Sequence, residues 1–332
     1  MKRFVVKFSV FLLLLAAALA LLEINARIMY PDPERGVLKQ KKQYLHEQHE
    51  RVEILVLGNS HSECSIDPAF LPRPGFNLSM PGIDLRTNRY LLNFWIDDLP
   101  RLDTLLIELS FFTFSFDVAE MRPYFTKDFL LQFGIWPPPD KWFTLPVDLL
   151  SYSSAFWLKH DQFVHDLVRR QRITLFHRLI GNRAPADPDM PRFVFQENGY
   201  RWSARIRSAR ERRKWARPKA EETMHYQREK KFIAANMAHL TAIVETARAR
   251  NVTPVLFSSP LTEEYLEFYD DALEREFYYL LHEFLAKNPD VRYFDLTRAA
   301  FITPANFRDA DHLNASGGQA VTRYLARQLW SQ

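Results

Sequence analysis

The sequence predicts an α/β protein of three layers, in which helices cover both faces of a doubly wound parallel sheet. Apolar runs of strand length, at 52–57, 104–110 and 252–259, alternate with longer amphipathic stretches. Strands that alternate with helices of this length are typical of parallel sheets. The chain has 332 residues, of which 47% are hydrophobic and 25% charged, and this ordinary globular balance suffices for one large domain.

The other elements are recognised by their boundary residues. Two further strands are expected at 75–80 and 291–296, and the first of them ends at a glycine turn. A helix is expected at 84–99 because Asp84 is a suitable N-cap. Apolar residues at helical spacing predict the remaining helices, at 221–250, 263–286 and 317–330.

The N-terminus predicts a membrane-spanning helix. A short basic tail, residues 1–7, precedes an apolar stretch over 8–24 that approaches the length a bilayer needs. A cleaved signal peptide is the alternative. Because positive charge stays on the cytoplasmic side, we expect a single-pass protein of the inner (cytoplasmic) membrane, with the remaining chain periplasmic or extracellular.

The rest of the chain divides into a stalk and a domain. Residues 25–50 are rich in Lys, Gln and His and are expected to form a polar stalk. The domain is expected over 51–332, with an insertion at about 111–218 that caps the core. The first part of this insertion, 111–154, is crowded with Phe, Trp and Pro, and its last part, 201–219, is basic.

Two separated segments suggest nucleophilic chemistry. Gly58-Asn59-Ser60-His61-Ser62 places Ser60 on a tight turn at the carboxyl end of a strand, where parallel sheets bind ligands. Asp309 and His312 share one loop near the other end of the chain. Ser, Asp and His are the three side chains that can convert a neutral hydroxyl into a nucleophile. The structural alternative is that Ser60 caps a helix and that His312 is an ordinary surface or capping residue.

The same residues resemble a known family. Gly58-Asn59-Ser60 and the Asp309-x-x-His312 spacing resemble the G-[D/N]-S and D-x-x-H blocks of the SGNH (GDSL-like) hydrolases. The likeness covers about 51–110 and 250–330 and implies an SGNH/flavodoxin-like sheet. More narrowly, the chain is similar to the membrane-anchored branch that acts on bacterial cell-envelope polymers, such as the teichoic-acid D-alanylation and alginate acetylation proteins. The resemblance selects Asp309 to orient His312, and Asp311 is then expected to cap the loop.

The resemblance also implies donors for an oxyanion. The backbone N–H groups of Ser60 and Gly82 are the expected donors, since Gly82 stands where the family has its second-block glycine; an ordinary turn is the alternative. The family's third block, G-x-N-D, is not recognisable, because the third strand ends in Glu108-Leu109-Ser110. Either Ser110 supplies a third donor or the oxyanion site has two.

The remaining candidate residues show weaker patterns for catalysis or metal binding. The single cysteine, Cys64, excludes a disulfide framework and is expected to be a small buried side chain, with a thiol nucleophile as the alternative. His46, His49 and His61 lack a metal-ligand pattern, so we expect neither metal nor cofactor. The basic run is expected to bind anionic polymer or lipid, or to be a solvated helix face. An exported domain is not expected to bind nucleic acid.

These observations favour an exported, membrane-tethered enzyme that transfers or removes an acyl group on a cell-envelope polysaccharide through an acyl-Ser60 intermediate. The resemblance implies a partner that carries the acyl group, commonly a multi-spanning membrane O-acyltransferase, and tethering would raise the effective concentration of such a partner. Two alternatives remain: a periplasmic esterase for lipids or small esters, and a non-catalytic glycan-binding scaffold with a degenerate site.

Overall fold

The computed structural model describes residues 2–29, 33–118, 133, 193–203 and 207–331. Helix α1 (Lys2–Met29) is apolar, and its segment Arg3–Ile24 is long enough to cross a membrane. This helix is either a signal sequence or a single membrane anchor. The apolar segment begins before the expected start at residue 8, because Phe and Val residues at 4–6 extend it.

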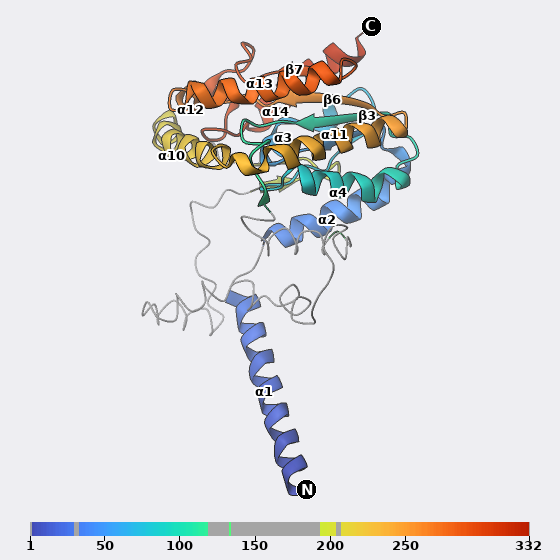
Figure 1. The fold of residues 1–332 in the computed structure, drawn as a ribbon, viewed down its shortest axis with the longest axis vertical. Helices are drawn as coiled ribbons and strands as arrows, with labels where there is room; N and C mark the ends of the chain where they lie inside the picture. The colour runs from blue at the N-terminus through green and yellow to red at the C-terminus, as the bar shows by residue number, and fades with distance from the viewer. Residues whose placement is uncertain (1, 30–32, 119–132, 134–192, 204–206, 332) are drawn as a thin grey trace. The chain divides into compact units, whose positions relative to one another are not determined.

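The core of the domain is a five-stranded sheet in which all neighbouring strands run parallel. In spatial order its strands are β2 (Gly75–Asn77), β1 (Ile54–Leu57), β3 (Thr104–Glu108), β6 (Thr253–Ser258) and β7 (Arg292–Asp295) (Figure 1). Every residue of β1 and β3 is buried, as expected for strands covered on both faces. The strand order reverses between β1 and β3, and such a switch point is where open α/β sheets bind ligands. The predicted parallel α/β fold is therefore confirmed.

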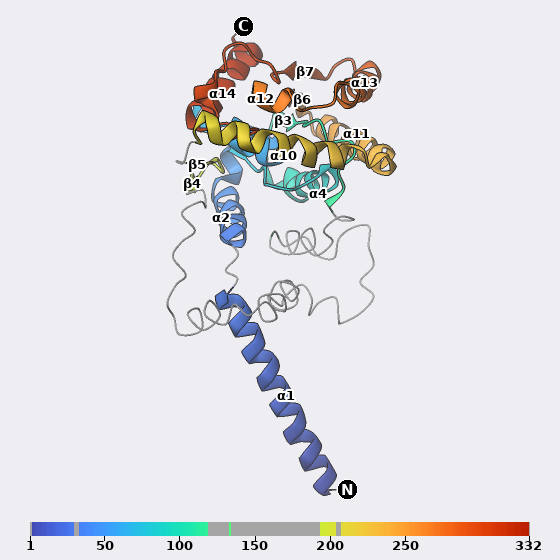
Figure 2. The same ribbon diagram turned by 90° about the vertical axis from the view of Figure 1, so that its left-hand side faces the viewer.

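Helices cover both faces of this sheet (Figures 1 and 2). One face carries α4 (Leu85–Trp95), α11 (Ile233–Ala249) and α13 (Asp271–Lys287), and the other carries α3 (Ser60–Ser65) and α14 (Ala315–Trp330). On the α14 side, alternate strand residues form one apolar cluster with the helix, which contains Ile54, Val56, Leu106, Val255, Phe257, Val321 and Leu325. The expected N-cap Asp84 is confirmed, because its side chain accepts a hydrogen bond from the Thr87 N–H.

The stretch expected as one helix at 221–250 is divided. Helix α10 (Ala209–Gln227) is followed by a 3₁₀ turn, Lys230–Phe232, and then by α11. Helix α10 begins inside the basic run, because Ser208 and Glu211 form a capping box that satisfies backbone N–H groups at its start. It lies across the carboxyl ends of the strands and packs against the short helix α12 (Glu263–Leu266) (Figures 1 and 2). The site described below therefore has a helical wall on this side.

The expected insertion is described only in part, because residues 119–132, 134–192 and 204–206 lie outside the described residues. Much of its aromatic segment is thus untested, but Phe111, Phe114 and Phe116 at its start are buried. Near its end, β4 (Phe193–Phe195) and β5 (Arg201–Ser203) form an antiparallel hairpin. The hairpin turn meets the edge strand β2, where the Asn77 N–H donates to the Asn198 carbonyl at 2.9 Å.

The segment expected as a stalk needs a correction. Residues 33–48 form helix α2 (Pro33–Gln48), and its side chains Leu38, Lys41 and Leu45 are 4%, 0% and 0% exposed. From residue 37 onward this helix is part of the compact domain. The expectation of a polar stalk over 25–50 was wrong for this helix. The buried stripe of the helix has Lys41 at its centre, between Leu38 and Leu45, and this lysine interrupts the apolar pattern in the sequence.

Candidate active site

Ser60 is the first residue of α3, directly after the turn that ends β1. Gly58 in this turn has φ +149°, and a Cβ there would lie 2.2 Å from Ser62 Oγ and 2.8 Å from Glu108 Cβ. Only glycine therefore fits the turn. Asn59 caps the helix by accepting a hydrogen bond from the His61 N–H at 2.8 Å. The tight turn predicted at the carboxyl end of a strand is confirmed.

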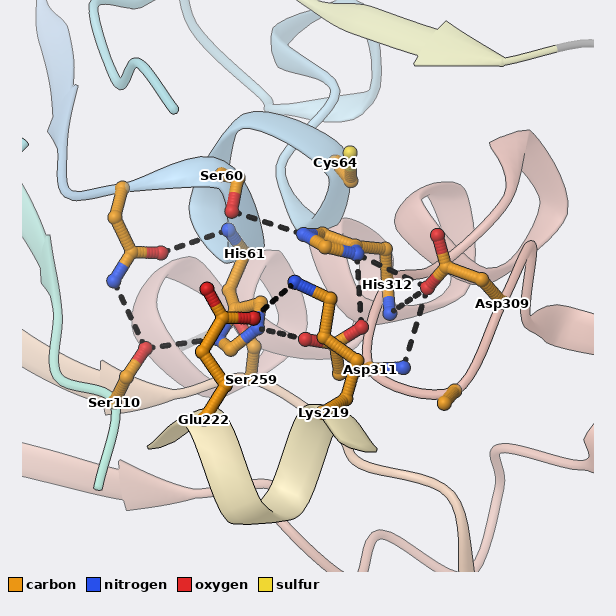
Figure 3. Close-up of polar contacts among 12 residues, drawn as sticks. Ser60, His61, Cys64, Ser110, Lys219, Glu222, Ser259, Asp309, Asp311 and His312 are labelled. Atoms are coloured by element: carbon orange, nitrogen blue, oxygen red, sulfur yellow. Dashed lines mark hydrogen bonds and ion pairs between the residues drawn. The ribbon is translucent and has the colours of Figure 1, made fainter. Parts of the chain in front are cut away.

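The structure brings Ser60, His312 and Asp309 together from opposite ends of the chain (Figure 3). Ser60 Oγ lies 2.9 Å from His312 Nε2, and His312 Nδ1 lies 3.0 Å from Asp309 Oδ1. These are the contacts of a serine nucleophile, its base and an orienting carboxylate. With the proton of His312 on Nδ1, the Nε2 atom is free to accept the Ser60 proton. The three residues thus have the predicted geometry, and their catalytic role remains a prediction.

Asp309 also fixes the backbone of its own loop. Its Oδ1 atom accepts hydrogen bonds from the N–H groups of Asp311 at 3.2 Å and His312 at 2.9 Å. Its Oδ2 atom accepts one from Arg308 Nε at 2.8 Å. The loop cap expected of Asp311 is therefore made by Asp309, which holds both the His312 ring and the His312 backbone.

Asp311 lies between two imidazoles instead of capping the loop. Its Oδ1 atom is 3.1 Å from His312 Nδ1, and its Oδ2 atom is 3.4 Å from His61 Nε2. The side chain is buried, and the two imidazole rings lie 5.1 Å apart between centroids. His312 Nδ1 consequently faces two carboxylates, of which Asp309 has the better hydrogen-bond geometry.

Burial and neighbouring groups determine the charges in this cluster. Burial favours the protonated Asp309 carboxyl, but His312 beside it more than offsets this effect and lowers the Asp309 pKa to about 2. Burial acts on Asp311 in the same direction, and His312 and His61 hold its pKa well below the ordinary value. Burial disfavours a charged His61, yet its contacts with Asp311 and Glu108 raise its pKa to about 9. Near neutral pH these contacts favour anionic aspartates and a protonated His61.

Ser110 supports His61. Its Oγ atom lies 2.8 Å from His61 Nδ1, accepts a hydrogen bond from Asn59 Nδ2 at 3.0 Å and donates to Glu108 Oε1 at 2.8 Å. Its backbone N–H donates to Thr113 Oγ1 at 2.8 Å. Both donors of Ser110 are thus already used, which does not favour its expected part in an oxyanion site.

The other expected oxyanion donors are backbone groups. Gly82 lies in the loop between β2 and α4 with φ +70°, a conformation that favours glycine. The Ser60 N–H lies at the start of α3, where backbone N–H groups are not used by the helix itself. For both groups the role of oxyanion donor remains a prediction.

Helix α10 contributes two charged side chains that the sequence did not suggest as site residues. Lys219 and Glu222 extend from it toward the cluster, and Lys219 Nζ lies 3.0 Å from Glu222 Oε2 (Figure 3). Burial opposes the charge on Lys219, but Asp311 and Glu222 outweigh it and raise the Lys219 pKa. Their spacing of three residues suits a helical ion pair, but no sequence pattern places that pair opposite Ser60.

Cys64 lies one helical turn beyond Ser60 on α3. Its side chain is 2% exposed, and burial raises the pKa of the thiol to about 11. The expected small buried side chain is confirmed, and a thiol that stays protonated at neutral pH is a weak nucleophile.

A divalent metal ion would find three potential ligands here. Ligand atoms of His61, Asp311 and His312 lie within 4.8 Å of one another. However, hydrogen bonds to Ser60 and Asp309 already engage both ring nitrogens of His312. A metal ion would have to replace one of these contacts, so the residues fit the hydrogen-bonded arrangement better than a metal site.

A search of protein-family models finds none that matches the chain, and a search of curated proteins finds no significant match. What the structure establishes is a parallel α/β fold with a Ser, His and Asp cluster at its switch point.

Proposed function

We propose that this protein is a serine-dependent acyl-transfer enzyme, in which Ser60 is the nucleophile, His312 the base and Asp309 the orienting carboxylate. The observation that carries this proposal is the pair of contacts at His312, 2.9 Å from Nε2 to Ser60 Oγ and 3.0 Å from Nδ1 to Asp309 Oδ1. A capping serine and a surface histidine would have no reason to meet across 252 residues of sequence.

The chemistry that we propose has two steps. In the first, Ser60 Oγ attacks the carbonyl of an ester, His312 Nε2 takes the hydroxyl proton, and this proton then passes to the departing alcohol. An acyl-Ser60 ester remains. In the second step an acceptor hydroxyl attacks this ester while His312 takes its proton, and Ser60 recovers a proton as it departs. A polymer hydroxyl as acceptor makes the enzyme a transferase, and water makes it a hydrolase.

The proposed substrate is an acyl group on a cell-envelope polysaccharide. The resemblance of Gly58-Asn59-Ser60 and Asp309-x-x-His312 to the SGNH hydrolases supports this choice, as does the apolar helix α1 if it is an anchor. The ion pair of Lys219 and Glu222 opposite the nucleophile offers one donor and one acceptor to a polyhydroxylated acceptor. A membrane protein that delivers the acyl group, such as a multi-spanning O-acyltransferase, is the partner that we propose.

A fluorophosphonate probe tests the proposed nucleophile. The whole protein in detergent should react with it, and Ser60→Ala should abolish labelling. Cys64→Ala is the matched control, because it changes a neighbouring residue of the same helix, and it should leave labelling intact. A wild-type protein that stays unlabelled while folded would overturn the enzymatic proposal in favour of the glycan-binding scaffold.

A second measurement separates transfer from hydrolysis. The labelled acyl group of an activated ester should move to a soluble oligosaccharide acceptor if the protein is a transferase. Release of the free acid alone, at a rate that the acceptor does not change, would identify a hydrolase of small esters or lipids.

A further inference from the structure

The two aspartates next to His312 are arranged alike. Each places Oδ1 near His312 Nδ1, at 3.0 Å for Asp309 and 3.1 Å for Asp311. Each places Oδ2 near a second basic side chain, Arg308 Nε at 2.8 Å for Asp309 and His61 Nε2 at 3.4 Å for Asp311. Two carboxylates therefore contact the His312 ring, and each of them also contacts a second basic side chain through its other oxygen.

This arrangement bears on the charge of the base. An opposite charge within a few ångströms favours the charged form of a titrating group, so two uncompensated carboxylates would favour the His312 imidazolium. An imidazolium cannot accept the proton of Ser60. If His312 is to be a neutral base near neutral pH, the negative charges of Asp309 and Asp311 must be balanced by other cations.

We propose that His61 is a positioning residue that acts as an imidazolium, balances the charge of Asp311 and thereby keeps His312 available as a neutral base. The proposal rests on the proposed function, because it takes His312 to be the base for Ser60. In this proposal His61 balances the negative charge of Asp311, as Arg308 balances that of Asp309.

The hydrogen-bond inventory around Ser110 indicates that His61 Nδ1 carries a proton, and since Nε2 faces the Asp311 carboxylate at 3.4 Å, both ring nitrogens have acceptors, as the imidazolium requires. Asn59 Nδ2 must donate to Ser110 Oγ, because the amide oxygen of Asn59 is used by the His61 N–H. If His61 Nδ1 also donates to Ser110 Oγ, the serine hydroxyl is free to donate to Glu108 Oε1 at 2.8 Å. The Ser110 hydroxyl then accepts from Asn59 and His61 and donates to Glu108. If Nδ1 were an acceptor instead, the hydroxyl would turn to it and the 2%-exposed Glu108 would lose this donor.

Other charged groups face the same pair. Glu108 Oε1 lies 3.8 Å from His61 Nδ1 at the end of β3, and this carboxylate also favours the imidazolium. From α10, Lys219 is a second cation near Asp311, but its side chain is 40% exposed and paired with Glu222. Solvent and Glu222 screen its charge. Of these two cations, His61 is the buried one and makes the direct contact with Asp311.

The test is the pH dependence of fluorophosphonate labelling at Ser60, measured on the whole protein in detergent. In His61→Gln the pH of half-maximal labelling should rise by roughly 1–3 units, while the rate at the alkaline plateau is largely kept. Asp311→Asn should lower this pH. The double variant should return toward the wild type, because both charges are then absent. His282→Gln, on the exposed side of α13, is the matched control and should leave the profile unchanged.

The possible outcomes distinguish the two proposals. A residue that only supports the fold would reduce labelling equally at every pH, without rescue by the second substitution, and this result would overturn the role of His61. If His61→Gln does not fold, His61→Asn replaces it, and an unchanged or lowered half-maximal pH in that variant contradicts the proposal. Wild-type labelling that depends on Ser60 leaves the proposed function standing in either case. A folded wild type that is not labelled at Ser60 overturns both.

Discussion

Lys41 and Glu63 form an ion pair inside the domain, with 3.1 Å between Nζ and Oε1 and both side chains at most 1% exposed. The Lys41 ammonium also donates to the Ser79 carbonyl, and Arg201 Nε lies 3.1 Å from the other oxygen of Glu63. Glu63 is on α3, the helix that begins with Ser60. The helix that follows the apolar N-terminal segment is thus joined to the helix of the nucleophile through a buried charge.

The first prediction concerns this ion pair. Lys41→Met should lower the free energy of unfolding by about 3–5 kcal/mol, because it leaves the buried Glu63 carboxylate with one cation fewer. Chemical unfolding followed by circular dichroism measures the change. The exposed Lys39→Met, on the same helix, should change stability little. Equal stability of the two variants would mean that α2 is not part of the folded domain.

The second prediction separates the two aspartates. Asp309→Asn should slow labelling at Ser60 by on the order of 10⁴, because an amide does not hold the His312 tautomer that accepts the serine proton. Asp311→Asn should keep most of the plateau rate and change mainly the pH profile. Circular dichroism spectra should show that both variants are folded. A larger loss of plateau rate in Asp311→Asn would make Asp311 the orienting carboxylate.

The third prediction is a pH-dependent stability. The pKa of His61 is about 9 in the folded protein, above the value of about 6.5 for an unperturbed histidine. The folded state therefore binds the proton more tightly, and this contribution is fully present below about pH 6.5 and is lost as the pH rises through about 9. The stability advantage over His61→Gln should decrease, by on the order of 3 kcal/mol or less, between about pH 6 and pH 10. Urea unfolding at several pH values measures it, and a constant difference would contradict a charged His61.

The fourth prediction concerns the N-terminal helix. The basic residues Lys2, Arg3 and Lys7 should keep the N-terminus in the cytoplasm. A reporter that is active only outside the cytoplasm should therefore be active when fused after Gln332, and a reporter that is active only in the cytoplasm should not. Deleting residues 2–24 should reverse the result. Activity of a cytoplasmic reporter in the intact fusion would refute export and, with it, the proposed envelope substrate. Detection of the helix on the mature protein by mass spectrometry would distinguish an anchor from a signal sequence.

Local signals explain why much of the fold could be predicted from the sequence. The apolar runs that form β1, β3 and β6 are bounded by residues that commonly end strands. Because both faces of these strands are buried, most positions in them are apolar, and the runs are easily recognised. The predicted contact of Asp309 with His312 is confirmed, because a separation of three residues in one loop allows it. These features depend on neighbours in the chain.

The features that were missed depend on distant contacts. The burial of Lys41 is possible only because Glu63, far along the chain, neutralises it, and composition alone therefore indicated a solvated stalk. Asp311 looked like a loop cap because its partner His61 precedes it by 250 residues. Lys219 was one lysine in a basic run, and only the course of α10 across the strand ends gives it a position near Ser60.

The separation of 252 residues between Ser60 and His312 also has a consequence during synthesis. Ser60 emerges from the ribosome before His312, its proposed base, has been synthesised. Until the loop that carries His312 has packed beside Ser60, the serine is an ordinary alcohol with no acceptor for its proton. A nascent or truncated chain therefore carries no activated serine, and the protein can react with acyl groups only after its fold is complete.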